Sequence, residues 1–210
     1  MGNENKSVTG KGNLKIIIIG GIAAGTSAAA KARRKSENAE IVIYEKYKYV
    51  SLGTCGLPYY VSGRINDIEN LIINTTSMFQ RRFNIRVNVL HEVLAINPES
   101  KTIRIKDLKT GREFSDSYDR LIIATGSSRI VINPELNNAS NSFELGTIDD
   151  AIRLKEYMKH LSNSSKALPQ KPAGTQEKTS GPAAVIAGGG YIGLELVEAF
   201  LTFGFKVTVI

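Results

Sequence analysis

Two short apolar stretches in this chain each run into a glycine-rich turn and then into a helix-forming segment. The first is KIIIIGGIAAGTSAAAKARRK at 15–35, and the second is AAVIAGGGYIGLELVEAFLTF at 183–203. A buried strand, a tight glycine turn and a helix packed back on the strand open a βαβ unit. The pattern therefore predicts an α/β fold with two Rossmann-like dinucleotide-binding units.

The first unit has further strand and helix signals. A helix at 23–35 follows a strand at 15–19, and 41–45 (IVIYE) reads as the next parallel strand. A short helix is predicted at 76–83, a helix at 56–63, and a buried strand at 120–124. Alternating apolar residues predict an antiparallel meander between the helix at 76–83 and the strand at 120–124, with segments at 85–89, 92–96, 102–106 and 112–118.

The expected domains follow from these elements. Residues 1–14 are polar and are predicted to be a disordered lead, 15–147 the first segment of one dinucleotide-binding domain, and 148–210 the start of a second one. A helix is expected at 148–161. Residues 162–182 are rich in Ser, Pro, Lys, Gln and Gly and predict a flexible linker.

The second unit looks truncated. It has strands at 183–187 and 206–210 around a helix at 191–203. Two parallel strands give too little sheet to close a core. We therefore expect the chain to be the N-terminal part of a longer design or a truncated product of one, and to be incomplete as an enzyme alone.

The second turn fits the dinucleotide fingerprint G-x-G-x-x-G with Gly188, Gly190 and Gly193. The first turn has Gly20 and Gly25 but Ile22 in the middle position. Glu45, which ends the next strand twenty positions after Gly25, stands where a carboxylate would accept ribose hydroxyls. Two dinucleotide turns in one chain suggest electron flow from one cofactor to the other.

The composition and the net charge indicate the setting and the partners that this protein is expected to have. The single cysteine permits no internal disulfide, which fits a reducing, cytoplasmic setting. No apolar run reaches membrane-spanning length, and no zinc spacing or RNA-binding signature accompanies the net charge of +7. We expect no nucleic-acid partner, no membrane partner and no metal. The positive charge is that of a basic surface or of a site for an anionic ligand.

The segment SLGTCGLPYY at 51–60 holds that cysteine. Together with GGIAAGTSAAAKARR, IVIYEK, YDRLIIATGS and GGGYIGLELVEAF, it resembles the single-cysteine branch of the flavin- and pyridine-nucleotide-dependent disulfide oxidoreductases. The resemblance covers roughly 15–210. Within the branch, CGLPYY looks most like the coenzyme A-disulfide reductases, and the NADH oxidases and peroxidases are close relatives.

The resemblance implies FAD on the first turn and NADH or NADPH on the second, so that 15–147 would be the first segment of an FAD-binding domain and 148–210 the start of an NAD(P)H-binding domain. It also implies a homodimer for the full-length parent. It implies FAD contacts at Gly20, Ala24, Gly25, Glu45, Lys46, Val93, Ala124, Thr125 and Gly126. It implies nicotinamide-side contacts at Gly190, Tyr191, Ile192 and Glu195, beside the fingerprint residues Gly188 and Gly193. Coenzyme A contacts match Ser27, Lys31, Arg34, Ser51 and Thr54.

Cys55 is the predicted catalytic residue. It stands at the start of the short helix, where Pro58 suits the first turn and the helix dipole favours a thiolate. Dithiol relatives use two cysteines that are five positions apart, but the residues five positions before and after Cys55 are Val50 and Tyr60. Cys55 therefore cannot form a disulfide within the chain and must cycle through a mixed disulfide or a sulfenic acid. The leading hypothesis is an oxidoreductase that reduces coenzyme A disulfide. The alternatives are an NADH oxidase that reduces oxygen, and an inactive nucleotide-binding fragment.

Overall fold

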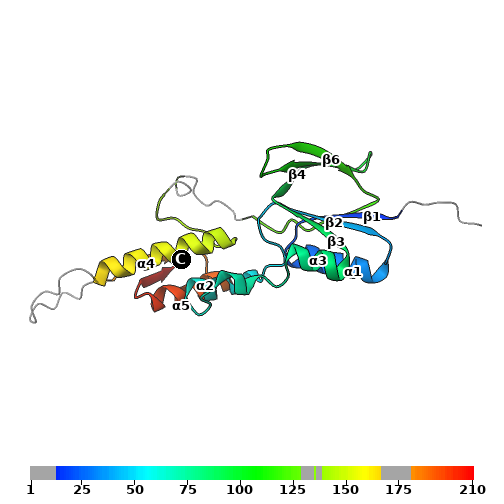
Figure 1. The fold of residues 1–210 in the computed structure, drawn as a ribbon. Coiled ribbons are helices and arrows are strands. Elements are labelled where there is room, and N and C mark those ends of the chain that lie inside the picture. Colours follow the sequence, from blue (N-terminus) through cyan, green and yellow to red (C-terminus); the bar gives the residue numbers. More distant parts are fainter. Residues whose placement is uncertain (1–12, 129–134, 136–138, 167–180) are drawn as a thin grey trace, which may run out of the picture. The chain divides into compact units, whose positions relative to one another are not determined.

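The computed structural model describes residues 13–128, 135, 139–166 and 181–210 (Figure 1). By packing, the chain divides into two compact units, Met1–Leu52 with Ile72–Arg129, and Gly53–Leu71 with Ile130–Ile210. The segment around Cys55 thus belongs to the same unit as the second glycine turn. The expected division of cofactors at residues 147 and 148 stays a prediction.

A four-stranded parallel sheet forms the centre of the first unit, with strand order β3-β2-β1-β7. Helices α1 and α3 cover one face, and a second, antiparallel sheet lies over the other face (Figure 1). The bounds are β1 Lys15–Ile19, α1 Ala23–Lys35, β2 Glu40–Glu45, α3 Thr76–Phe83, β3 Ile85–Val89 and β7 Arg120–Ile123.

The central strands are apolar along their whole length because both of their faces are buried. Ile16 and Ile18 of β1 pack with Ala29 of α1 on the helical face. Ile17 and Ile19 face the other way and pack with the antiparallel sheet. This two-sided burial fixes the strand that leads into the first glycine turn.

The antiparallel sheet has the order β4-β5-β6, with β4 His91–Asn97, β5 Thr102–Asp107 and β6 Glu113–Ser117. The prediction that 85–89 belongs to this meander was wrong. These residues form β3, which pairs in parallel with β2. Asn84, in the left-handed conformation at φ 47°, ends α3 and turns the chain into β3. Ile85 is then buried against the helical face.

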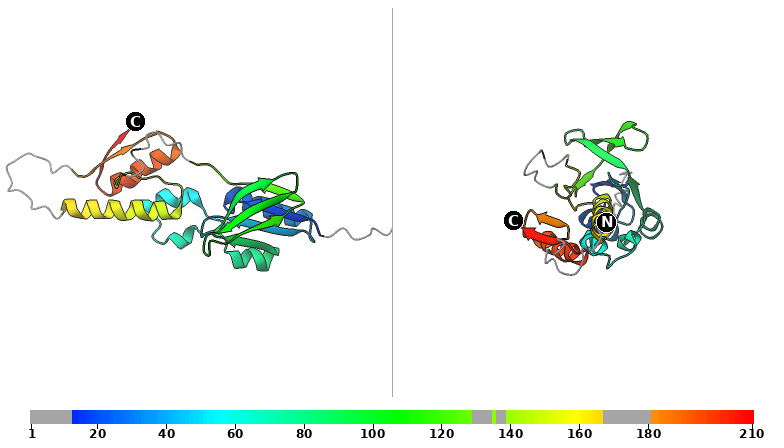
Figure 2. Two further views of the ribbon diagram at one scale, coloured as in Figure 1. Left: turned by 90° about the horizontal axis from the view of Figure 1, so that it is seen from above. Right: turned by 90° about the vertical axis from the view of Figure 1, so that its left-hand side faces the viewer.

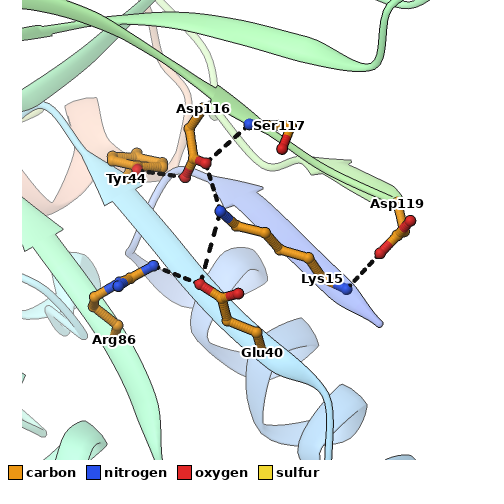
Figure 3. Close-up of polar contacts among 7 residues, drawn as sticks. All are labelled: Lys15, Glu40, Tyr44, Arg86, Asp116, Ser117 and Asp119. Atoms are coloured by element: carbon orange, nitrogen blue, oxygen red, sulfur yellow. Dashed lines mark hydrogen bonds and ion pairs between the residues drawn. The ribbon is translucent and has the colours of Figure 1, made fainter. Parts of the chain in front are cut away.

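A polar network joins the two sheets of the first unit (Figure 3). The Asp116 carboxylate on β6 accepts hydrogen bonds from the Tyr44 hydroxyl at 2.8 Å and from the Lys15 ammonium at 2.5 Å. Arg86 pairs with Glu40 at 2.6 Å, and Glu40 also lies 3.7 Å from Lys15. Residues from β1, β2, β3 and β6 thus meet in one cluster, which holds the meander on the parallel sheet.

Tyr44→Phe is expected to flatten the alkaline loss of stability. Burial, and next the hydrogen bond to Asp116, raise the pKa of Tyr44 above its usual range. The unfolded chain releases this proton above about pH 10 while the folded chain keeps it, so stability falls as pH rises, by at most about 1.4 kcal/mol per pH unit. The variant loses about 1 kcal/mol at neutral pH and shows a smaller slope. Urea unfolding between neutral pH and pH 11 measures both.

The exposed Tyr47 supplies the control for this prediction. Tyr47→Phe should keep the wild-type dependence of the unfolding free energy on pH. An unchanged alkaline slope in Tyr44→Phe would contradict the assignment.

The second unit contains a two-stranded parallel sheet and the helix between its strands, and Figure 2 shows the orange and red strands beside the orange helix α5. Its elements are η1 Thr54–Gly56, α2 Leu57–Val61, η2 Ile68–Leu71, α4 Ile148–Lys166, β8 Ala183–Ile186, α5 Tyr191–Thr202 and β9 Lys206–Val209. Among the helices of the described ranges, none is long and apolar enough to cross a membrane.

The predicted start of the linker at 162 was wrong, because α4 continues to Lys166. Ser162 is buried, and the Ser164 hydroxyl donates to the carbonyl of His160 at 2.8 Å. A serine that bonds back to the preceding turn is accommodated in a helix, so a serine-rich composition does not by itself end one. The remainder of the predicted linker, 167–180, and the predicted lead at 1–12 lie outside the described residues.

Candidate functional site

The first glycine turn is built by two close backbone approaches. Gly20 has φ +101° and sits against the carbonyl of Ala124, so any side chain there would overlap that carbonyl. A Cβ on Gly25 would overlap the carbonyl oxygen of Gly20 and lie 3.3 Å from Cγ2 of Ile18. Gly25 is therefore the residue that lets α1 pack on β1, which is the role expected of the third fingerprint glycine.

Glu45 is buried next to this turn, and its side chain is hydrogen-bonded to the backbone of the turn. Its two carboxylate oxygens accept hydrogen bonds from the backbone N–H groups of Gly21 at 2.6 Å and Tyr47 at 2.8 Å. A carboxylate has about four acceptor positions, so these two bonds leave capacity for others. The ribose contact stays a prediction, whereas the contact with Gly21 fixes the backbone of the turn.

Both glycine turns lead into helices that lack a side-chain cap. Among the described residues, no side chain caps α1 at Ile22 or α5 at Gly190, and neither first turn contains an acid. The other two long helices are capped. The Thr75 hydroxyl accepts from the first turn of α3, and Thr147 and Asp150 bond reciprocally at the start of α4. The free N–H groups of α1 and α5 suit anionic phosphates.

The second turn repeats the first. Gly188 has φ +109°, and a Cβ on Gly193 would overlap the Gly188 carbonyl oxygen and lie 3.3 Å from Cγ2 of Ile186. Gly190 differs from both, because its φ of −73° suits any residue and a Cβ there would meet nothing within 4 Å. The chain's own packing gives no reason for glycine at this position, while close approach of a ligand to the backbone does.

The other predicted flavin contacts lie around the first turn or farther along the first unit. The Ala124 N–H donates to the Ile19 carbonyl at 2.8 Å, which places Ala124 beside the turn, with Thr125 and Gly126 exposed after it. Lys46 is exposed directly after β2. Val93 pairs with a residue of β5 just before a register shift, and its side chain packs toward the core between the sheets.

One face of α1 carries three of the predicted substrate contacts. Ser27, Lys31 and Arg34 are spaced by four and three residues, and all three are exposed, as is Ala24 on the same face. The result is a polar, basic stripe that begins at the flavin turn.

The two predicted substrate contacts before the cysteine differ from each other. Thr54 is exposed. Ser51 is buried at φ 54°, its N–H donates to the Gly21 carbonyl at 2.8 Å, and its hydroxyl accepts from Asn74 at 3.3 Å. Ser51 therefore anchors the strand end after Glu45 to the glycine turn, and its contact with substrate stays a prediction.

Cys55 is exposed in the single 3₁₀ turn that precedes α2. The buried side chains of Leu57, Pro58 and Val61 fix the helix below it. Gly63 has φ +84° and its N–H donates to the Tyr60 carbonyl at 3.1 Å, so the helix ends as predicted. The thiol is thus presented to solvent on a segment whose opposite face is packed.

The predicted nicotinamide-side residues lie at the start of α5. Tyr191 is 90% exposed and Ile192 is exposed beside it. Glu195 is half-buried and lines a pocket of about 60 Å³ between α5 and the segment after Cys55. The residues around this pocket are Pro58, Tyr59, Ser62, Arg64, Glu195 and Glu198.

Two basic residues have structural roles that the sequence analysis did not assign. The Arg33 guanidinium donates to the carbonyls of Phe83 at 2.8 Å and Asn84 at 2.7 Å, so it ties α1 to the end of α3. Lys155 is buried on α4, next to Tyr60. The sequence held a sign of the role of Lys155, because this lysine occupies a position of α4 where the helical repeat places apolar residues. It held no such sign for Arg33, which is one of several basic residues in a row.

Together these features define an α/β protein with two dinucleotide-type glycine turns and an exposed lone cysteine. Residues 14–210 match the family described as pyridine nucleotide-disulphide oxidoreductase, and the chain belongs to this family. The prediction of the family and that of the Rossmann-like fold class are both confirmed.

Relatives share the fold over most of this chain. Coenzyme A disulfide reductase of Staphylococcus haemolyticus (strain JCSC1435) is 31% identical over 196 residues, 93% of this chain and 40% of that protein. The crystal structure of reduced Bacillus anthracis CoADR-RHD has a TM-score of 0.81 at 36% identity and covers 95% of this chain and 33% of its own. The water-forming NADH oxidase from Lactobacillus brevis, bound to NADH, has a TM-score of 0.79 at 27% identity, over 94% of this chain and 39% of its own. The chain therefore spans about 40% of the length of the curated relatives that it matches.

Proposed function

We propose that this chain is part of an NAD(P)H-dependent flavoprotein that reduces coenzyme A disulfide through Cys55. The observation that carries the proposal is the exposure of Cys55, the only cysteine of the chain, within a pyridine nucleotide-disulphide oxidoreductase. These 210 residues hold no second thiol, and the sulfur that would pair with Cys55 in this proposal is that of the substrate.

The two glycine turns fit the two dinucleotides. The uncapped start of α1, with Gly20, Ala24 and Gly25, would hold the FAD pyrophosphate, and Glu45 and Lys46 would hold its adenosine. FAD, when bound, would supply a carrier for the electron pair that the nicotinamide delivers.

The nicotinamide dinucleotide would lie on the second turn. Gly188, Gly190 and Gly193 would admit its pyrophosphate to the start of α5. Tyr191, Ile192 and Glu195 would line the nicotinamide side. The open space at Gly190 supports this placement, because a ligand that comes close to the backbone gives glycine a purpose there.

The chemistry at Cys55 is one disulfide exchange and one reduction. The Cys55 thiolate attacks one sulfur of the coenzyme A disulfide, so that a Cys55–coenzyme A disulfide forms and one coenzyme A thiolate leaves. Two electrons then cleave the mixed disulfide. The products are a second coenzyme A thiolate, which takes up a proton, and the regenerated Cys55 thiolate.

The basic stripe on α1 supports an anionic substrate. Lys31 and Arg34 are exposed and have no ion-pair partner among the described residues, and Ser27 offers a hydroxyl between them and the glycine turn. Charge-assisted hydrogen bonds from such side chains suit the phosphates of coenzyme A. Thr54, exposed next to Cys55, would contact the substrate near the reacting sulfur.

The second candidate is an NADH oxidase, in which Cys55 would cycle through a sulfenic acid and oxygen would be the acceptor. The observation that favours it is the likeness to the Lactobacillus brevis water-forming NADH oxidase. This mechanism has no use for the basic stripe, so the two candidates differ in what they require of Lys31 and Arg34.

The test is the covalent state of Cys55 in the flavin-loaded, full-length protein after incubation with coenzyme A disulfide. We expect intact mass spectrometry to show one coenzyme A added as a disulfide, removed by a reductant and mapped to Cys55. Lys31→Ala with Arg34→Ala should slow adduct formation by about 10- to 100-fold, the equivalent of one or two charge-assisted contacts. The control, Lys109→Ala with Arg112→Ala, removes two charges from an exposed turn and should not slow it. A protein that forms sulfenic acid and no adduct would support the oxidase instead.

A further inference from the structure

Lys155 is a charged residue at an apolar position of α4. The buried residues of this helix include Ile148, Ala151, Met158 and Ser162, and Lys155 continues their spacing of three and four residues. Only 6% of Lys155 is exposed. A lysine on a helix surface usually extends its ammonium into water, and this one does not.

Among the residues that the structure describes, the buried ammonium of Lys155 contacts two groups, and both belong to the segment that follows Cys55. Its Nζ lies 3.8 Å from the ring centroid of Tyr60 on α2. It also donates to the carbonyl of Ile65 at 3.4 Å. Within the described ranges, no carboxylate lies within ion-pair distance of Lys155.

This arrangement is costly for stability alone. Taking an ammonium out of water without a counter-charge is unfavourable, and an apolar residue of similar size usually fits such a place as well or better. The burial lowers the pKa of Lys155, and repulsion from Lys159 lowers it further. What the lysine gains is a desolvated cation–π contact, the stronger form of that interaction.

The short α2 depends on its surroundings for its position. Its five residues, Leu57–Val61, are too few for a helix that is stable alone. Leu57, Pro58 and Val61 bury one side. Tyr60 is only half-buried, and among the described residues the cation that contacts its ring is the Lys155 ammonium.

We propose that Lys155 is a positioning residue for the Cys55 segment, and that its ammonium fixes α2 by holding the Tyr60 ring and the Ile65 carbonyl. The inference rests on the proposed function, because fixing the position of α2 matters for activity only if Cys55 is the reacting group. Lys155 contacts neither substrate nor the reacting sulfur in this role. It sets where the helix after Cys55 lies.

The experiment compares Lys155→Met, Lys155→Arg and Lys159→Met in the flavin-loaded, full-length protein. Methionine keeps the length and removes the charge, arginine keeps the charge, and Lys159 is an exposed lysine one turn away. We expect Lys155→Met to raise amide hydrogen exchange in 57–65 at least about 10-fold while the Tm stays the same or rises. The kcat for disulfide reduction should fall about 10-fold, and flavin reduction by NADH should not change. Lys155→Arg should recover most of both losses, and Lys159→Met should match the wild type.

The outcomes separate the two proposals. Wild-type exchange in 57–65 of Lys155→Met, or faster exchange throughout the unit with a lower Tm, would overturn the positioning role. In that case loss of turnover in Cys55→Ser would still support the proposed function. Conversely, faster local exchange in Lys155→Met together with an active Cys55→Ser would keep the role of Lys155 in fixing α2 and reject Cys55 as the reacting group.

Discussion

Cys55→Ser in the flavin-loaded, full-length protein will lose the reduction of coenzyme A disulfide, by at least about a thousandfold. The variant keeps the size of the side chain and its exposed position in the turn before α2. It removes the one cysteine of these 210 residues, and with it the sulfur that would form the mixed disulfide. Serine cannot replace it, since its hydroxyl neither ionises near neutral pH nor bonds covalently to a disulfide sulfur.

Two measurements make this result specific to Cys55. Stopped-flow reduction of the flavin by NADH should proceed at the wild-type rate, because the residues of the second turn are unchanged. Ser62→Ala removes a hydroxyl that donates to the Tyr59 carbonyl at 3.0 Å in the same segment, and it should retain disulfide turnover. Continued disulfide turnover in Cys55→Ser would reject the proposal. Peroxide release with oxygen uptake, and no requirement for Lys31 or Arg34, would point to the oxidase.

The sequence was most informative where a residue's role depends on its near neighbours in the chain. The glycine spacing predicts the contact of Gly25 with Gly20 and of Gly193 with Gly188, because each pair lies within one strand–turn–helix. The two-sided burial of β1 follows in the same way from its unbroken run of isoleucine. The pairing of β3 did not follow, since an alternating strand at the edge of a parallel sheet looks like a strand of a meander.

Contacts between distant residues could not be read from the pattern. The carboxylate of Asp116 receives Lys15 and Tyr44 from strands that precede it by 101 and 72 positions. Lys155 lies 90 positions after Ile65, whose carbonyl it contacts. The only local sign of such contacts is a residue of the wrong polarity for its place, such as a lysine in an apolar repeat. That sign marks a residue whose partner must be sought, and it does not name the partner.

Gly25→Ala will abolish flavin binding and lower the stability of the first unit by about 3 kcal/mol or more. The added methyl would overlap the carbonyl oxygen of Gly20 and press on Cγ2 of Ile18. The first obstacle is backbone, which cannot rotate away as a side chain can. Either α1 moves off β1 or the turn at Gly20 opens, and both displace the N–H groups that would meet the FAD pyrophosphate. Flavin content per chain by absorbance, with a urea unfolding curve, measures both losses.

Two other glycines show whether the effect belongs to the turn. Gly146→Ala adds the same methyl where the nearest atom is the Asp150 carboxylate at 3.9 Å, so flavin content and stability should stay at wild-type values. Gly193→Ala repeats the clash in the second turn, against the Gly188 carbonyl. It should keep its flavin but lose reduction by NADH, because the damaged helix start is that of α5. A yellow, stable Gly25→Ala protein would mean that α1 can shift without harm to the site. Loss of flavin in Gly193→Ala would mean that the second turn also supports FAD, against the division of the two turns between two cofactors.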